Sequence, residues 1–183
     1  MKTVALPSLQ SEIISAAVSY SPPPWYAIRT KSNCERVVAS VLATKGYEVF
    51  LPCYQVQRRW SDRKVIASVP LFPGYVLSRF DLDRRVEVVN TPGLVSIVSF
   101  GNQPMPIPED EVVAIKSLVA SGLPIQSSEY LREGQRVRIK GGPLEHVEGI
   151  MVKKKTVWRF VVSISLLQRS VAVEVDSQWV TSA

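Results

Sequence analysis

The hydrophobic pattern of this 183-residue chain changes character between residues 122 and 129. Before that point, apolar residues at helical spacing alternate with short branched segments that are typical of strands. After it, only short branched segments occur, and turn residues separate them at close intervals. Two patterns in one chain predict an α+β domain at 25–121 and a small all-β barrel at 130–183, joined by a linker at 122–129.

The first domain is predicted to mix strands and helices. A strand at W-Y-A-I-R-T leads into an amphipathic helix, for which Asn33 is a suitable N-cap and Gly46 a suitable end. The apolar residues Val37, Val38 and Leu42 recur on one face of this helix. A later helix at E-D-E-V-V-A-I-K-S-L-V-A-S-G has proline before it, acids in its first turn and glycine at its end. Further predicted elements are strands at 47–52, 76–80 and 94–100, a hairpin at 55–70 with its tip at 61–63, and a short helix that begins at Asp81.

One stretch, P-L-F-P-G-Y-V at residues 70–76, places two prolines, a glycine and two aromatic residues at the start of a strand, and strand formation requires none of them. Its two prolines remove ladder donors, and its glycine allows the backbone to bend. The pattern fits a rigid turn that feeds a buried strand, and it also fits a preformed aromatic surface for a partner. At period two, Tyr75 and Leu77 share one face of the strand and Val76 lies on the other, so one of these faces must be core.

The composition narrows the chemistry that the chain can perform. A net charge of +6 attracts nucleic acid weakly and is also common in proteins that never bind it. The two cysteines, Cys34 and Cys53, are expected to be free thiols of a reducing cytoplasm, with a single bridge as the alternative. One histidine, His146, is too few for a His/Cys zinc site, and its loop setting offers no catalytic partner. We therefore expect no enzymatic activity, no cofactor and no metal.

Residues 1–24 are predicted to be a disordered tail that the Pro22–Pro24 run tethers to the first domain. A secretory signal is the alternative, although Glu12 interrupts the apolar run that a signal requires. No segment reaches the roughly 20 apolar residues of a membrane span. We expect a cytoplasmic monomer with no membrane contact.

Several motifs together resemble the NusG family of transcription elongation factors. They are W-Y-A-I-R, P-L-F-P-G-Y-V, G-N-Q-P-M-P-I-P-E-D-E-V and E-G-Q-R-V-R-I-K-G-G-P-L-E-H-V-E-G-I, and the resemblance covers residues 25–183. It implies an NGN domain, an α/β sandwich whose antiparallel sheet is flanked by helices, followed by a KOW domain with an SH3-like barrel. It further implies that Phe72, Tyr75 and Leu77 lie in or beside a depression that receives the clamp helices of RNA polymerase.

The resemblance also implies secondary contacts. Arg84 and Arg85 align with a segment that meets the polymerase gate loop in specialised paralogues, or else they lie on a solvated helix face. Lys31, Arg36 and Lys45 lie on the side where non-template DNA passes, and they could contact phosphates without reading bases.

In the KOW domain, Gly142 and Gly149 match hairpin loops, where glycine permits turn geometry. Leu144 and Leu167 match an exposed apolar patch that receives a further factor, such as Rho, a ribosomal protein or another elongation factor. The run at 153–155 is either a solvated hairpin or an RNA contact.

The function implied is transcription elongation or antitermination, in which the NGN domain suppresses pausing or termination and the KOW domain recruits a further factor. The N-terminal tail and the leucine replacements resemble specialised paralogues of the RfaH, UpxY or LoaP kind. The alternative is an RNA-binding or ribosome-binding KOW protein that does not act on polymerase. Branched residues at period two, such as Val171, Val173 and Val175, predict strands throughout residues 130–183. We therefore expect a loosely tethered barrel and an open depression around Tyr75.

Overall fold

The computed structural model describes residues 22–59, 64–129, 134–154, 157–175 and 179–182. At the centre of the N-terminal half lies an antiparallel sheet with the strand order β2-β5-β1-β6, and β9 pairs with the start of β1. The sheet consists of β1 (Trp25–Thr30), β2 (Glu48–Phe50), β5 (Tyr75–Arg79), β6 (Leu94–Ile97) and β9 (Pro106–Ile107). The α+β architecture predicted for this half is confirmed.

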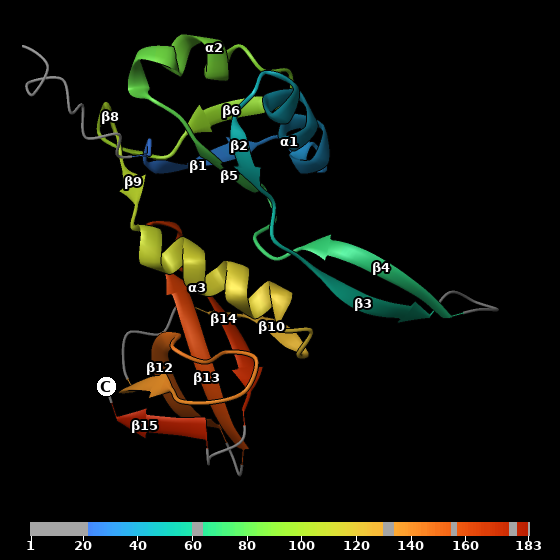
Figure 1. Ribbon diagram of the computed structural model, residues 1–183. Coiled ribbons are helices and arrows are strands. Elements are labelled where there is room, and N and C mark those ends of the chain that lie inside the picture. Colours follow the sequence, from blue (N-terminus) through green and yellow to red (C-terminus); the bar gives the residue numbers. More distant parts are fainter. Residues whose placement is uncertain (1–21, 60–63, 130–133, 155–156, 176–178, 183) are drawn as a thin grey trace, which may run out of the picture.

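Both faces of this sheet are buried, because helices cover it on two sides (Figure 1). Helices α1 (Glu35–Thr44) and α2 (Arg85–Val89) share one apolar cluster with Tyr26, Ile28 and Val76. Helix α3 (Glu109–Ala120) shares a second cluster with Trp25, Ala27 and Leu77. Adjacent residues of β5 therefore enter different cores, so the prediction of a core face is confirmed and the opposite face is core as well.

The start of α1 differs from the prediction. Asn33 has a φ of +61°, and Cys34 occupies the N-cap position without a side-chain capping hydrogen bond. Val37, predicted on the apolar face, is 54% exposed, whereas Val38 and Leu42 are fully buried. The buried stripe is narrower than the apolar pattern because the sheet meets only one side of the helix.

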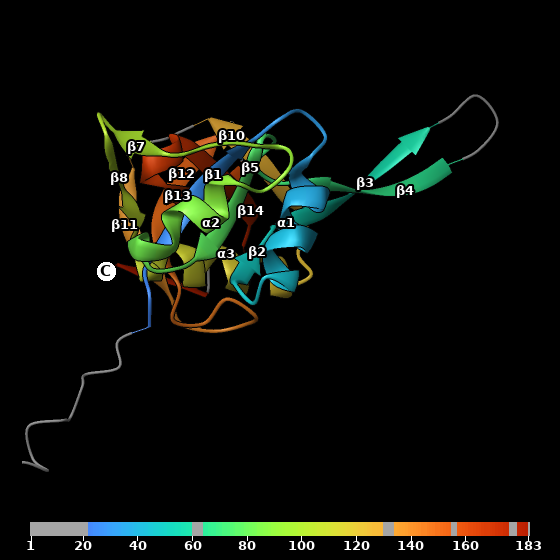
Figure 2. The same ribbon diagram turned by 90° about the horizontal axis from the view of Figure 1, so that it is seen from above.

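The predicted hairpin forms an arm that projects away from the rest of the protein (Figures 1 and 2). It consists of β3 (Cys53–Arg59) and β4 (Lys64–Pro70), and the predicted tip at 61–63 lies outside the described residues. A smaller hairpin, β7 (Ser99–Phe100) with β8 (Gln103–Pro104), precedes β9, and a short 3-10 turn, η2 (Leu82–Arg84), precedes α2.

The C-terminal half is all-β, as predicted. Six antiparallel strands follow the order β10-β14-β13-β12-β11-β15 and curl around an apolar interior that includes Ile139, Phe160 and Ile164 (Figure 1). The elements are β10 (Ile125–Glu129), β11 (Gln135–Ile139), β12 (Glu148–Lys154), β13 (Val157–Ile164), η3 (Ser165–Leu167), β14 (Arg169–Glu174) and β15 (Val180–Ser182). We refer to them as the C-terminal sheet.

The connection between the halves corrects two expectations. Most of the predicted linker is β10, which pairs with β14 along its whole length, so the segment without regular structure is much shorter. The C-terminal sheet is also not loosely tethered: α3 packs on β13, and the Ser165 N–H donates to Glu111 Oε2 at 3.1 Å. One apolar cluster runs from the N-terminal sheet through α3 into the C-terminal sheet.

Candidate functional site

The turn before β5 is fixed by hydrogen bonds to two other elements. The Gly74 N–H donates to Glu35 Oε1 at 2.7 Å, and the Gly74 carbonyl accepts from the Thr30 N–H at 2.8 Å. Gly74 has a φ of +83°, which glycine adopts without strain. Glu35, in the first turn of α1, is only 7% exposed, and sequence reasoning missed its role. The available signal was an acid two residues after Asn33, the predicted cap.

The three residues expected to meet the clamp helices differ in exposure. Phe72 and Leu77 are each 1% exposed and belong to the cluster that α3 shares with the sheet. Tyr75 is half-buried and packs against that cluster. The depression is therefore not open as expected: in this conformation only Tyr75 offers surface to a partner, and the other two support the core behind it.

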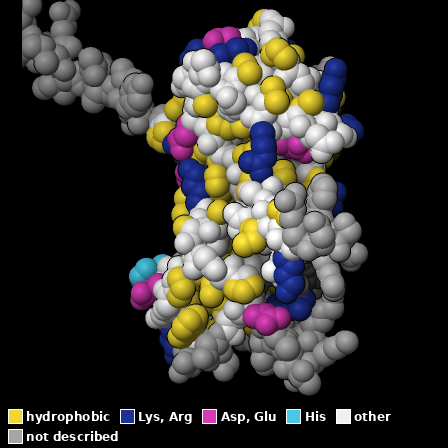
Figure 3. All heavy atoms as spheres, turned by 90° about the vertical axis from the view of Figure 1, so that its right-hand side faces the viewer, with side chains coloured by type: hydrophobic (Ala, Val, Ile, Leu, Met, Phe, Trp, Pro, Cys, Tyr) yellow, Lys and Arg dark blue, Asp and Glu magenta, His cyan; other side chains and the backbone are white. Residues whose placement is uncertain are grey.

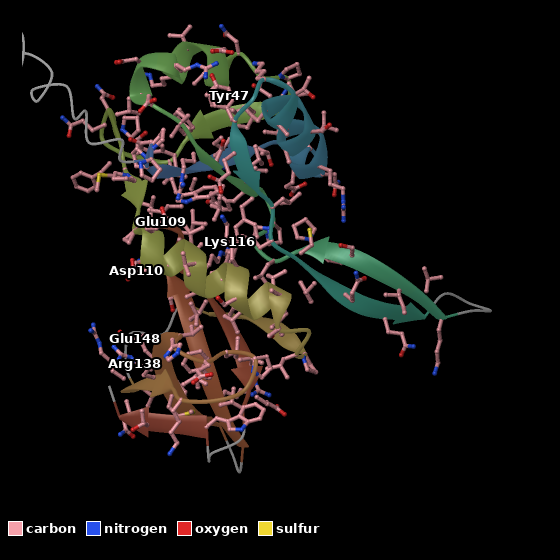
Figure 4. All side chains as sticks on the ribbon, viewed as in Figure 1. Tyr47, Glu109, Asp110, Lys116, Arg138 and Glu148 are labelled. Atoms are coloured by element: carbon pink, nitrogen blue, oxygen red, sulfur yellow. The ribbon has the colours of Figure 1, made fainter. Side chains whose placement is uncertain are left out.

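A charged cluster joins α3 to the sheet around Trp25, and α3 contributes Glu109 and Lys116 to it (Figure 4). The fully buried Trp25 ring lies under two cations, with Arg79 Cζ at 4.9 Å and Lys116 Nζ at 4.5 Å from its centroid. Glu109 accepts from Trp25 Nε1 at 3.3 Å and pairs with Arg79, while Glu48 pairs with Lys116 at 3.1 Å. These contacts hold α3 over the Phe72 and Leu77 side of the sheet.

Arg84 is exposed, and two contacts fix the position of its guanidinium. Its guanidinium lies 4.5 Å from the centroid of the Tyr47 ring, and its Nη2 is 2.9 Å from Glu87 Oε2. Burial is the main cause that raises the pKa of Tyr47, and the adjacent Glu87 is the second. The interaction with the Tyr47 hydroxyl is the main cause that lowers the pKa of Glu87, and the interaction with Arg84 is the second. Arg85 is exposed as well, so both arginines predicted for the gate-loop side lie at the surface.

We expect Glu87→Gln to make stability less sensitive to acid. Because folding lowers the pKa of Glu87 from its ordinary 4.5, its carboxylate stabilises the native state above that pH. The contribution is lost as the pH falls through the lower folded value. Urea midpoints at neutral pH and at about pH 3 should show a smaller acid-induced drop in the variant than in the parent. Equal drops would contradict the assigned interaction.

The segment formed by η2 and α2 exposes three apolar side chains, and Figure 3 shows hydrophobic side chains on the surface at this end of the molecule as well as elsewhere. Val86 is 69% exposed, Leu82 44% and Val89 42%. The sequence predicts this segment as a gate-loop contact or as a solvated charged helix face, and neither interpretation uses its exposed apolar side chains. The alternation of apolar and charged residues was visible, but the pattern could not show that Val88 alone turns inward.

The three predicted DNA-backbone residues are not equivalent. The Arg36 guanidinium donates to the Ser68 carbonyl at 2.7 Å. Lys45 Nζ donates to the Glu87 carbonyl at 2.8 Å and to Thr91 Oγ1 at 3.0 Å, so it ties the end of α1 to α2. Lys31 is exposed. Two of the three cations therefore already have structural partners.

The two leucines predicted on an exposed patch of the C-terminal half are buried, which corrects that expectation. Leu144 is 1% exposed and Leu167 8%, and both belong to the apolar cluster. The loop that carries Leu144 and the 3-10 turn that carries Leu167 fold these side chains into the apolar interior. The side chains of 153–155 lie outside the described residues.

The two glycines of this half have different roles. Gly142 has a φ of +79°, as expected for a turn. Gly149 lies within β12, and a Cβ built there would be 2.6 Å from the Val161 carbonyl oxygen. Gly149 therefore permits close strand packing instead of a turn.

A groove of about 590 Å³ lies between α3 and the C-terminal sheet. Its wall on the α3 side includes Asp110, Val113 and Ser117, and its wall on the sheet side includes Arg136 and Ile150 (Figure 4 labels Asp110). The groove marks the boundary between the two halves, and it lies beside the Glu111–Ser165 hydrogen bond.

Chemical groups for catalysis or metal binding do not converge in the part of the chain described. Among those residues, no group of three or more His, Cys, Asp or Glu side chains could hold a metal ion. Cys34 and Cys53 are both free. The His146 side chain is 85% exposed, with Glu145 Oε1 at 3.8 Å. None of the described helices is long and apolar enough to span a bilayer.

Comparison with known proteins assigns the family. The model of the family described as "Transcription termination factor nusG" matches residues 23–116, which is half of the chain. The chain is 29% identical to the transcription termination/antitermination protein NusG of Borreliella burgdorferi, over 84% of this chain and 95% of the relative. It is 28% identical to the NusG of Thermus thermophilus, over 87% and 98%.

A solved structure described as "Domain interaction in Thermotoga maritima NusG" has the same fold, with a TM-score of 0.52 at 23% identity and coverage of 87% and 96%. The fold and the sequence thus define a two-part chain of the kind found among transcription termination factors. The chain belongs to the NusG family.

Proposed function

We propose that this protein is a transcription termination or antitermination factor that binds the clamp helices of RNA polymerase through residues 25–121. The observation that carries the proposal is the family match, which runs from the residues before β1 into α3. Residues 130–183 would recruit a further factor, and the whole chain would act in the cytoplasm without catalytic activity.

Within this proposal, Tyr75 is the anchor of the polymerase contact. It is half-buried on a turn that Gly74 and Glu35 hold rigid, so little conformational entropy is lost when a partner docks. Phe72 and Leu77 contribute by keeping the core behind Tyr75 filled, unless the contact between α3 and the sheet opens on binding. Arg85 with exposed Val86 supplies the surface on the gate-loop side. Lys31 supplies a DNA-backbone contact, whereas the partners of Arg36 and Lys45 favour structural roles.

Tyr75→Ala is expected to weaken polymerase binding about thirtyfold, because truncating an interface anchor costs about 2 kcal/mol. Binding of the full-length chain to core RNA polymerase would be measured by titration. The control is Phe100→Ala, which removes an aromatic side chain that is 84% exposed on a different hairpin. A folded Tyr75→Ala protein that binds like the parent would show that the anchor is misplaced.

A reconstituted transcription assay tests the function itself. The full-length protein should change pausing or readthrough at a terminator, with no hydrolase or transferase activity. Unchanged elongation together with tight binding to ribosomes or RNA would favour the alternative of a KOW protein that does not act on polymerase. A second, more typical family member in the same genome would support the role of a specialised paralogue.

A further inference from the structure

Helix α3 and the C-terminal sheet are joined twice, once by side-chain contacts and once by a short length of chain. Only four residues, 121–124, separate the end of α3 from the start of β10 (Figure 1). Four residues span at most about 14 Å when they are fully extended. The C-terminal sheet therefore cannot move far from α3 while β10 keeps its place in that sheet.

The four connecting residues are themselves ordered by local contacts. Ser121 Oγ donates to the Leu118 carbonyl at 2.7 Å and accepts from the Leu123 N–H at 3.2 Å. Gly122 has a φ of +68°, which glycine adopts without strain at the end of a helix. Leu123 also packs against the apolar cluster that the two halves share. The connection thus fixes the direction in which the chain enters β10.

Strand β10 lies at the edge of the C-terminal sheet. It pairs with β14 from Ile125 opposite Val173 to Glu129 opposite Arg169, and it has no other neighbour among the described strands. An edge strand of five residues can detach without breaking the pairs between the other five strands. Its detachment would lengthen the tether between α3 and β11 to the fourteen residues 121–134, which span up to about 50 Å.

The side-chain contact between α3 and the C-terminal sheet is incompletely packed. The groove of about 590 Å³ lies along it, and α3 lines the groove with Asp110, Ala114 and Ser117, which recur on one helical face. The hydrogen bond from the Ser165 N–H to Glu111 is exposed, so water competes for both groups. A contact of this kind persists only if the tether keeps the effective concentration of the two surfaces high.

We propose that β10 is a detachable strap: paired with β14, it keeps the C-terminal half against α3, and its release frees that half on a longer tether. Effective concentration falls about as the −3/2 power of tether length. Lengthening the tether from four to fourteen residues therefore lowers the ratio of joined to separated molecules about sixfold. The device is intramolecular, so it does not depend on the polymerase binding proposed above.

Two variants of the full-length protein lengthen the tether by different routes. Gln126→Pro/Ser127→Pro removes a ladder donor from β10, because successive N–H groups of a strand point to opposite sides. Its control, Gln126→Ala/Ser127→Ala, keeps both backbone donors. The second variant inserts ten glycine and serine residues after Gly122 and leaves β10 paired. Its control inserts the same ten residues after Gly101, in the exposed turn between β7 and β8.

Three measurements follow the two halves without any partner. Relaxation of backbone ¹⁵N nuclei in the parent should give one rotational correlation time for both halves. Amide hydrogen exchange at Ser165 reports how often its contact with Glu111 opens. Exchange at Phe160, within the inner strand β13, reports whether the C-terminal sheet unfolds as a whole.

Protection of the Ser165 amide should fall about sixfold in the proline variant and in the variant with the insertion after Gly122, and it should not change in either control. Amides of β14 should lose protection in the proline variant alone. If Phe160 also loses protection there, the insertion variant decides, because it leaves the sheet intact. Unchanged Ser165 protection after that insertion, an alanine control that matches the proline variant, or two correlation times in the parent would each overturn the proposal.

Discussion

Replacing Gly149 by alanine is expected to lower the free energy of unfolding of the C-terminal sheet by about 3 kcal/mol. The new Cβ would lie 2.6 Å from the Val161 carbonyl oxygen and 2.7 Å from two ring carbons of Phe160. The oxygen belongs to the neighbouring strand, and the Phe160 ring is fully buried, so neither can move aside without repacking.

Gly141→Ala is the matched control in the same half of the protein. Its Cβ would meet only Trp179 Cδ1 at 3.8 Å, an ordinary contact. Urea denaturation of the full-length variants would measure both effects. A Gly149→Ala protein as stable as Gly141→Ala would mean that β12 and β13 are not packed as closely as described.

Trp25→Ala is expected to cost about 3 to 5 kcal/mol, the range for removing a large buried aromatic side chain. The substitution leaves a cavity under α3 and removes the ring on which Arg79 and Lys116 lie. It also removes the Trp25 Nε1 donor to Glu109, so β1 and α3 lose a hydrogen bond that joins them. Thermal and urea unfolding would measure the loss.

A graded variant separates packing from the polar contacts. Trp25→Phe keeps an aromatic ring for the two cations but loses the Nε1 donor, so its loss of stability should be clearly smaller. Equal losses for phenylalanine and alanine would show that the cations gain nothing from the ring. Loss of polymerase binding in Trp25→Ala alone would in addition connect the position of α3 to the surface around Tyr75.

The order of strands and helices could be predicted because each element carries its own local signal. The β5 segment and both long helices follow from periodicity, and Gly74 follows from the turn chemistry around it. The assignment of faces could not be predicted in the same way. Both sides of β5 carry apolar residues, and only the packing of α3 on one side and α1 on the other shows that both are core.

The interactions that decide which candidate residues are free also lie beyond local patterns. Lys45 reaches Thr91 across 46 positions, and Trp25 reaches Glu109 across 84. A surface lysine and a structural lysine have the same sequence signature. Leu144 shows the same limit: its sequence setting is that of a solvated loop, yet the side chain is buried in the apolar cluster.

Helix α3 restricts how this chain could be recombined with its relatives. A chimera that joins this N-terminal half to a foreign C-terminal half would place its junction near Gly122, at the end of α3. That junction keeps the contacts of α3 with Trp25 but gives Glu111 and the nearly buried Ala114 a new neighbour. A grafted sheet must therefore present a backbone N–H near Glu111 and an apolar surface against Ala114, or the contacts that join the two halves are lost.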